Sequence, residues 1–163
     1  MLGPLSNPAG APRQIIGVWH KDLAERLARV LAALGTEHAW VVHGEDGLDE
    51  ITLAGKTHVA EARESEVRTF EIGPGDFGFD EGALDHLRGG DTEANAAIVR
   101  AVLAGKRKDE ARALVIMTAA ASLMLGGLAH DLREGAKQAG EAIDSGAALA
   151  KLERLVEATN QTS

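Results

Sequence analysis

The stretch QIIGVWHKDLAERLARVLAALGTEHAWVVHGEDGL, residues 14–48, decides the fold class of this chain. Residues 14–19 and 39–42 are short apolar runs, which favours two buried strands. Between them, apolar residues recur on one face of a helix that opens at Asp22 and ends before Gly35. A strand, a helix and a second buried strand form a βαβ unit, which predicts a parallel sheet.

The pattern changes after this unit. Residues 57–60 and 67–72 are typical of strands, and the charged segment between them predicts antiparallel additions to the sheet. Residues 1–12 and 73–79 are predicted to be loops because Pro and Gly punctuate them. Helices are predicted over 92–104, 109–126, 131–143 and 147–159. The sequence therefore predicts an α/β fold: a partial mixed β-sheet with a parallel βαβ start and antiparallel additions, flanked by helices and ending in an all-helical C-terminal third.

Composition narrows the classes of protein. The 163 residues fit one domain, and the absence of Cys excludes disulfides and thiolate metal sites. The net charge of −8 argues against nonspecific binding to nucleic acid. The N-terminus lacks the pattern of a signal peptide, and residues 113–129, although uncharged, favour a buried helix over a membrane span. We expect a cytoplasmic protein with neither nucleic acid nor membrane as partner.

The acidic loop HGEDGLDE, residues 43–50, is the strongest candidate site. It starts at the carboxyl end of a predicted strand, where open α/β sheets bind ligands. Adjacent carboxylates suit Mg²⁺, which takes oxygen ligands and usually shares its shell with water and substrate phosphates. The carboxylates are Glu45, Asp46, Asp49 and Glu50. The same spacing also fits a solvated acidic turn or a helix N-terminus, where Asp and Glu interact favourably with the helix dipole, and spacing alone favours that interpretation.

Two further features have both a functional and a structural interpretation. His43 adjoins the acidic loop, so it is a candidate base or ligand, but a neutral histidine hydrogen-bonded at a strand end is the favoured interpretation. The sequence Gly89-Gly90-Asp91-Thr92 could bind phosphate at a helix start. Helix capping by Asp91 or Thr92 explains it adequately.

Four segments carry a resemblance to a known family. They are LGPLSNPAGAPRQIIGVW (2–19), VVHGEDGLDE (41–50), LRGGDTEANAAIVRAVLAG (87–105) and AIDSGAALAKLERLVEAT (142–159). In this order they resemble the C-terminal half of anthranilate phosphoribosyltransferases. In that family an adjacent Asp-Glu pair binds Mg²⁺, so the resemblance implies Asp49 and Glu50 as metal ligands and leaves Glu45 and Asp46 as solvent-exposed charges. It also implies that Gly3, in the LGPL loop, borders the anthranilate channel.

The resemblance implies a reaction of tryptophan biosynthesis, in which a phosphoribosyl group passes from phosphoribosyl diphosphate to anthranilate. It makes residues 1–163 a single C-terminal α/β portion, without the family's N-terminal helical domain and its Gly-Thr-Gly-Gly-Asp phosphate loop. We therefore expect an exposed sheet edge, uncovered apolar helix faces and no activity from these residues alone, which leaves open whether the chain is an enzyme.

Two alternatives remain. The chain could be a subunit of a split enzyme, completed by a separate N-terminal half, or a non-catalytic binding or scaffold module that retains the fold. Members of the family form homodimers, and the oligomeric state of this chain stays open.

Overall fold

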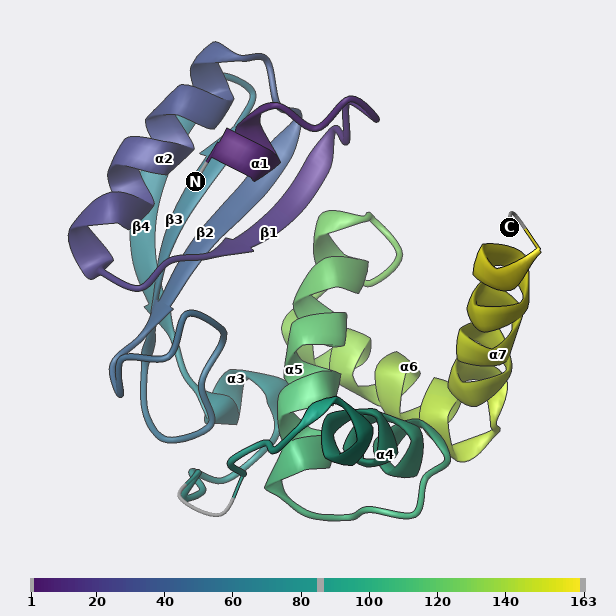
Figure 1. The fold of residues 1–163 in the computed structure, drawn as a ribbon. Coiled ribbons are helices and arrows are strands. Elements are labelled where there is room, and N and C mark those ends of the chain that lie inside the picture. Colours follow the sequence, from purple (N-terminus) through teal and green to yellow (C-terminus); the bar gives the residue numbers. More distant parts are fainter. Residues whose placement is uncertain (1, 85–86, 162–163) are drawn as a thin grey trace.

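The computed structural model describes residues 2–84 and 87–161, which form a four-stranded mixed sheet and a group of helices (Figure 1). The strands are β1 (Arg13–Gly17), β2 (His38–Gly44), β3 (Thr57–Arg63) and β4 (Glu66–Ile72), in that order across the sheet. Strands β1 and β2 are parallel and are joined by helix α2 (Lys21–Ala33), whereas β3 and β4 are added antiparallel. The predicted βαβ start and mixed sheet are confirmed.

Each face of the sheet has its own hydrophobic core. Because successive side chains of a strand point to opposite faces, Val41 of β2 packs with α2, while Trp40 and Val42 pack with the C-terminal helices. Those helices are α4 (Thr92–Leu103), α5 (Glu110–Leu125), α6 (Leu132–Asp144) and α7 (Ala147–Asn160). Figure 1 shows them gathered beyond β1, away from α2. The all-helical C-terminal third is therefore confirmed.

Helix α5 contains most of the uncharged segment 113–129, which was predicted to be a buried helix. Its buried residues, such as Met117 and Ala120, belong to the core between the sheet and α6. A Cβ atom on Gly135 of α6 would lie 2.7 Å from the Ala120 carbonyl oxygen, so the two helices approach closely only because Gly135 has no side chain. In the described part of the chain, no helix combines the length and apolarity needed to cross a membrane.

Some predicted boundaries were wrong. Short helices α1 (Leu2–Leu5) and α3 (Pro74–Phe77) occupy segments that were predicted to be loops. In α3, Pro74 has a backbone preset for a first helical turn, and the Asp76 carboxylate accepts a 2.8 Å hydrogen bond from the Gly73 amide. A single turn is too short to show a helical period in the sequence. Strand β2 also continues through Gly44, two residues beyond its predicted end, because β3 pairs with it that far.

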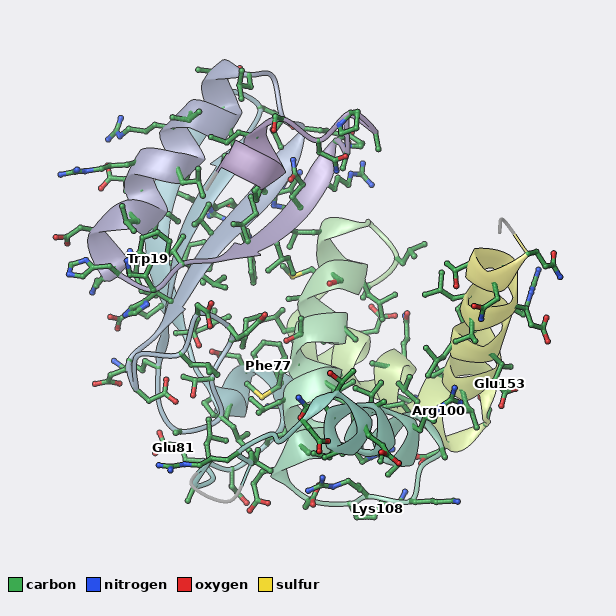
Figure 2. All side chains as sticks on the ribbon, in the orientation of Figure 1. Trp19, Phe77, Glu81, Arg100, Lys108 and Glu153 are labelled. Atoms are coloured by element: carbon green, nitrogen blue, oxygen red, sulfur yellow. The ribbon has the colours of Figure 1, made fainter. Side chains whose placement is uncertain are left out.

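The expected sheet edge and apolar surface are present. Among the described residues β1 pairs with β2 alone, so its outer edge is unpaired. Trp19, Leu34 and Leu128 are each more than half exposed, and Trp19 is labelled in Figure 2. Helix α7 buries no residue fully in the described structure.

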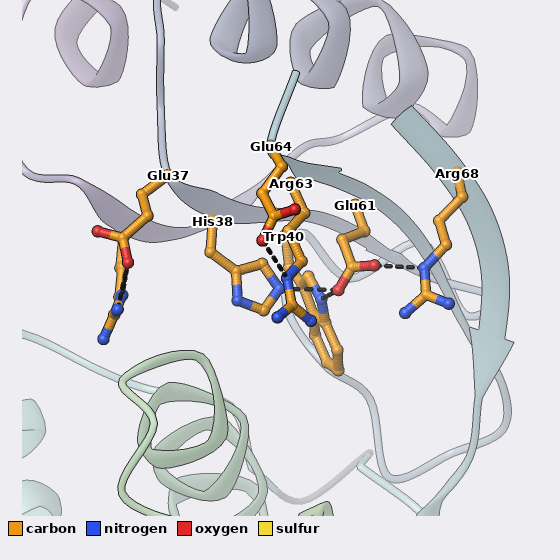
Figure 3. A network of polar contacts seen from close by, with 8 residues as sticks. Glu37, His38, Trp40, Glu61, Arg63, Glu64 and Arg68 are labelled. Carbon is orange, nitrogen blue, oxygen red and sulfur yellow. Dashed lines mark hydrogen bonds and ion pairs between the residues drawn. The ribbon is translucent and has the colours of Figure 1, made fainter. Parts of the chain in front are cut away.

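A buried carboxylate ties three strands together (Figure 3). Glu61 of β3 is only 3% exposed, and it accepts hydrogen bonds from His38 Nε2 at 2.8 Å and Trp40 Nε1 at 2.9 Å, both on β2. Arg68 of β4 donates to its other oxygen. Burial by itself would raise the pKa of Glu61, but the hydrogen bonds from Arg68, Trp40 and His38 outweigh it and lower that pKa.

We expect Glu61→Gln to lower the free energy of unfolding at pH 7 by about 2 kcal/mol, because it removes a charge with three donors around it. A lowered pKa in the folded state stabilises the fold above the unfolded-state pKa, ordinarily 4.5, and this contribution is lost as the pH falls through the folded value. Urea unfolding at pH 7 and at acid pH should therefore show a difference between the two proteins that shrinks in acid.

The exposed residue Glu66 at the start of β4 provides the control. Glu66→Gln should change stability by less than about 0.5 kcal/mol. Equal effects of the two substitutions, or a difference that grows in acid, would contradict the assigned role of Glu61.

Candidate active-site loop

The acidic loop leaves the carboxyl end of β2 and returns to β3, beside the end of β1 (Figure 1). Backbone hydrogen bonds close it at both ends. The Gly44 amide donates to the Leu48 carbonyl and the Glu45 amide to the Lys56 carbonyl, each at 2.8 Å. Gly47 has φ of +91°, a left-handed conformation that a residue without a side chain adopts readily. The loop is therefore a defined turn at the edge where α/β sheets bind ligands.

Two of the four acidic residues hold the loop itself. The Asp46 carboxylate accepts from the Leu48 amide at 3.3 Å and from the hydroxyl of buried Thr52 at 2.9 Å. Glu45 accepts from the Lys56 amide at 3.2 Å. Both side chains are exposed, as the resemblance implied, but describing them as solvated charges was incomplete because they are acceptors within the loop.

The other two acidic residues remain available for a ligand. Asp49 and Glu50 are both exposed, and among the described residues neither carboxylate has a hydrogen bond or ion pair with a side chain or backbone amide. Partial burial of its carboxyl group, and then the charge of Asp49, raise the pKa of Glu50. The next residue, Ile51, is fully buried, so the pair lies directly beside a segment anchored in the core.

This donor set fits a shared magnesium ion. Mg²⁺ is commonly held by one or two carboxylates, with water and substrate phosphate oxygens completing six positions. Within residues 2–84 and 87–161, no three side chains of the metal-binding types come together. Asp49 and Glu50 would thus supply two oxygen ligands and leave most of the shell to substrate and water.

His43 supports the site without belonging to the acidic pair. Its Nδ1 lies 2.8 Å from the carbonyl oxygen of Val18, just beyond β1, and since a carbonyl only accepts, the ring must donate. The predicted hydrogen-bonded histidine at a strand end is confirmed. Sequence reasoning missed Gly17, the residue before Val18. The Cα atom of Gly17 lies against the backbone of Asp49. A contact between residues so far apart in sequence leaves no local pattern.

The remaining candidates lie elsewhere. Asp91 caps α4 by accepting from the Ala94 amide at 2.9 Å, which confirms the capping interpretation. Gly3 lies in α1, whose neighbours Pro4 and Leu5 line a hollow with Leu34 at the C-terminal end of α2. The acidic loop follows the other end of the sheet, so the structure does not bring Gly3 together with Asp49 and Glu50. A role for Gly3 in substrate binding stays a prediction.

The comparisons with known proteins agree with this architecture. The family model described as "Glycosyl transferase family, a/b domain" matches residues 1–149, so the chain belongs to that family. Within it, the chain resembles the C-terminal part of anthranilate phosphoribosyltransferases. The protein of that name from Rhodopseudomonas palustris (strain HaA2) is 53% identical over 156 residues, which cover 96% of this chain and 46% of the relative.

Two further matches support the same assignment. The anthranilate phosphoribosyltransferase of Azorhizobium caulinodans is 54% identical over 98% of this chain and 46% of its own length. A solved structure of the Saccharomyces cerevisiae enzyme in complex with PRPP and Mg matches with a TM-score of 0.83 and 31% identity, over 91% of this chain and 43% of that one. The chain thus spans about half the length of the relatives that it matches.

We expect Thr52→Val to loosen the acidic loop while keeping the shape of the side chain. The substitution removes the hydroxyl that donates to Asp46 and accepts from the Ala54 amide at 3.0 Å. The free energy of unfolding should fall by about 1 to 2 kcal/mol, and amides of residues 44–56 should exchange hydrogen faster. Denaturant unfolding and amide exchange by NMR measure these effects.

Thr69→Val is the matched control, because Thr69 is an exposed residue of β4. It should leave exchange in residues 44–56 unchanged. The same exchange rates for wild type and Thr52→Val would contradict the role given to this hydroxyl.

Proposed function

We propose that the chain is the C-terminal α/β part of an anthranilate phosphoribosyltransferase and that Asp49 and Glu50 are its Mg²⁺ ligands. One observation carries the proposal: an adjacent, exposed pair of carboxylates, unpaired among the described residues, lies in the loop after the central strand β2 of a fold shared with that family. The pair lies at the carboxyl edge of the sheet, where substrates of such folds bind.

The proposed reaction explains why this edge is acidic. The bond between the ribose C1 and the diphosphate oxygen breaks, a bond from C1 to the anthranilate nitrogen forms, and that nitrogen loses a proton. When bound, Mg²⁺ would offset the charge that builds on the leaving diphosphate. Asp49 and Glu50 would hold this cation at the sheet edge, and the closed loop would keep their oxygens oriented toward the substrate.

The chain is proposed to need a further part to be active. Its relatives are about twice as long. A magnesium ion held by only two carboxylates lacks the phosphate oxygens that complete its shell. The resemblance assigns the cradle for those phosphates to the N-terminal half, with its Gly-Thr-Gly-Gly-Asp loop. We therefore propose that residues 1–163 alone bind the metal weakly and that turnover requires that half.

The test is reconstitution. The N-terminal half of the Rhodopseudomonas palustris relative, fused to the chain or added in trans, should restore consumption of anthranilate in the presence of phosphoribosyl diphosphate and Mg²⁺. Asp49→Asn with Glu50→Gln should lower turnover by about two orders of magnitude, and higher Mg²⁺ should recover part of it. The reaction is measured by the loss of anthranilate fluorescence.

Glu45→Gln is the control, because the glutamine oxygen can still accept from the Lys56 amide. It should retain most of the activity. Normal turnover by the double variant would show that the acidic pair is only a solvated turn. A folded fusion without activity would favour the non-catalytic scaffold over the enzyme.

A further inference from the structure

Gly17, the last residue of β1, touches the acidic pair through the backbone of Asp49. A Cβ atom built on Gly17 would lie 1.6 Å from the Asp49 carbonyl oxygen and 2.6 Å from its carbonyl carbon. Atoms cannot approach so closely, so any side chain at this position would push the Asp49 backbone away by more than an ångström. The contact joins the carboxyl end of β1 to the segment that carries both carboxylates.

The backbone conformation of Gly17 does not require glycine. The φ angle of Gly17 is outside the left-handed range, in which several other glycines of this chain lie, such as Gly35 and Gly47. Alanine could adopt this conformation without strain, so the need for glycine arises from the contact with Asp49 alone. A substitution therefore tests that contact directly, without a change in local backbone preference.

The position of Gly17 is itself fixed from the side of β2. Gly17 pairs in register with Val42. The following residue, Val18, donates its amide to the Val42 carbonyl at 3.0 Å and accepts through its own carbonyl from His43 at 2.8 Å. The end of β1 cannot shift readily to relieve a clash, so the Asp49 segment would have to move instead.

We propose that Gly17 is a positioning residue for the metal-binding pair, and that His43 assists it by holding Val18. This inference rests on the proposed function, because it gives Asp49 and Glu50 the task of binding Mg²⁺. On one side the pair is anchored by fully buried Ile51, and on the other it rests on Gly17. Displacement of reacting groups by about an ångström can cost a hundredfold in rate.

The first test uses the 163-residue chain and does not depend on turnover. In Gly17→Ala without metal, NMR amide signals of residues 48–51 should shift, while those of α6 should not. Mn²⁺ prefers the same carboxylate ligands as Mg²⁺, and with inorganic diphosphate it should broaden the Asp49 and Glu50 signals of the wild type. The variant should need about ten times more Mn²⁺ for the same broadening.

Gly75→Ala is the matched control, because a Cβ atom there meets nothing within 4 Å. It should respond to Mn²⁺ as the wild type does. In the reconstituted enzyme, Gly17→Ala should raise the Mg²⁺ concentration for half-maximal activity about tenfold and change the anthranilate KM much less.

If Gly17→Ala does not fold, two variants of His43 test the inference instead. His43→Ala removes the hydrogen bond to Val18 and should raise the required Mn²⁺ about threefold. In His43→Asn an amide nitrogen can take the place of Nδ1, and the wild-type response should return. A wild-type response in His43→Ala, or in a folded Gly17→Ala, overturns the inference. Absence of broadening at Asp49 and Glu50 in the wild type instead overturns the proposed metal site, and this inference with it.

Discussion

The packing of β2 is the constraint on which the rest of the structure depends. This strand is hydrogen-bonded on one side to β1 and on the other to β3, and its side chains enter both hydrophobic cores. Trp40 and Val42 face the C-terminal helices, and Val41 faces α2. A polar side chain at any of the three would lie in a core without a partner. Since β2 is held on both edges and both faces, its carboxyl end is a firm base for the acidic loop.

Much of this architecture could be predicted because it depends on local patterns. The helical period that follows Asp22, and the glycine at position 35 with φ of +81°, fix the crossover between β1 and β2. Strands β3 and β4 follow from two strand-like segments with a charged turn between them. The adjacency of Asp49 and Glu50 is also visible in the sequence, although spacing alone favours a solvated turn and only the family resemblance favours a metal site.

What the sequence could not predict depends on contacts between distant residues. Glu61 resembles any charged residue of a strand, and only the pairing of β3 with both neighbours surrounds it with donors. Spacing alone could not distinguish Asp46 from Asp49, and the hydrogen bond of Asp46 to Thr52 could not be predicted, because it forms only when the loop closes. The role of Gly17 depends on the three-dimensional path of a loop more than thirty residues further along the chain.

The four carboxylates of the acidic loop have two different roles, and these follow from the same constraints. Carboxylates that bind a cation must stay exposed, yet they must not be free to move, because each lost degree of freedom would otherwise oppose binding. Here Glu45 and Asp46 accept hydrogen bonds within the loop, whereas Asp49 and Glu50 have no side-chain partner among the residues that the structure describes. The chain beyond the pair is fixed by Ile51 in the core, and the backbone of Asp49 itself lies against Gly17. The scaffold therefore supplies rigidity, while the charge remains available to a cation and its phosphate ligands.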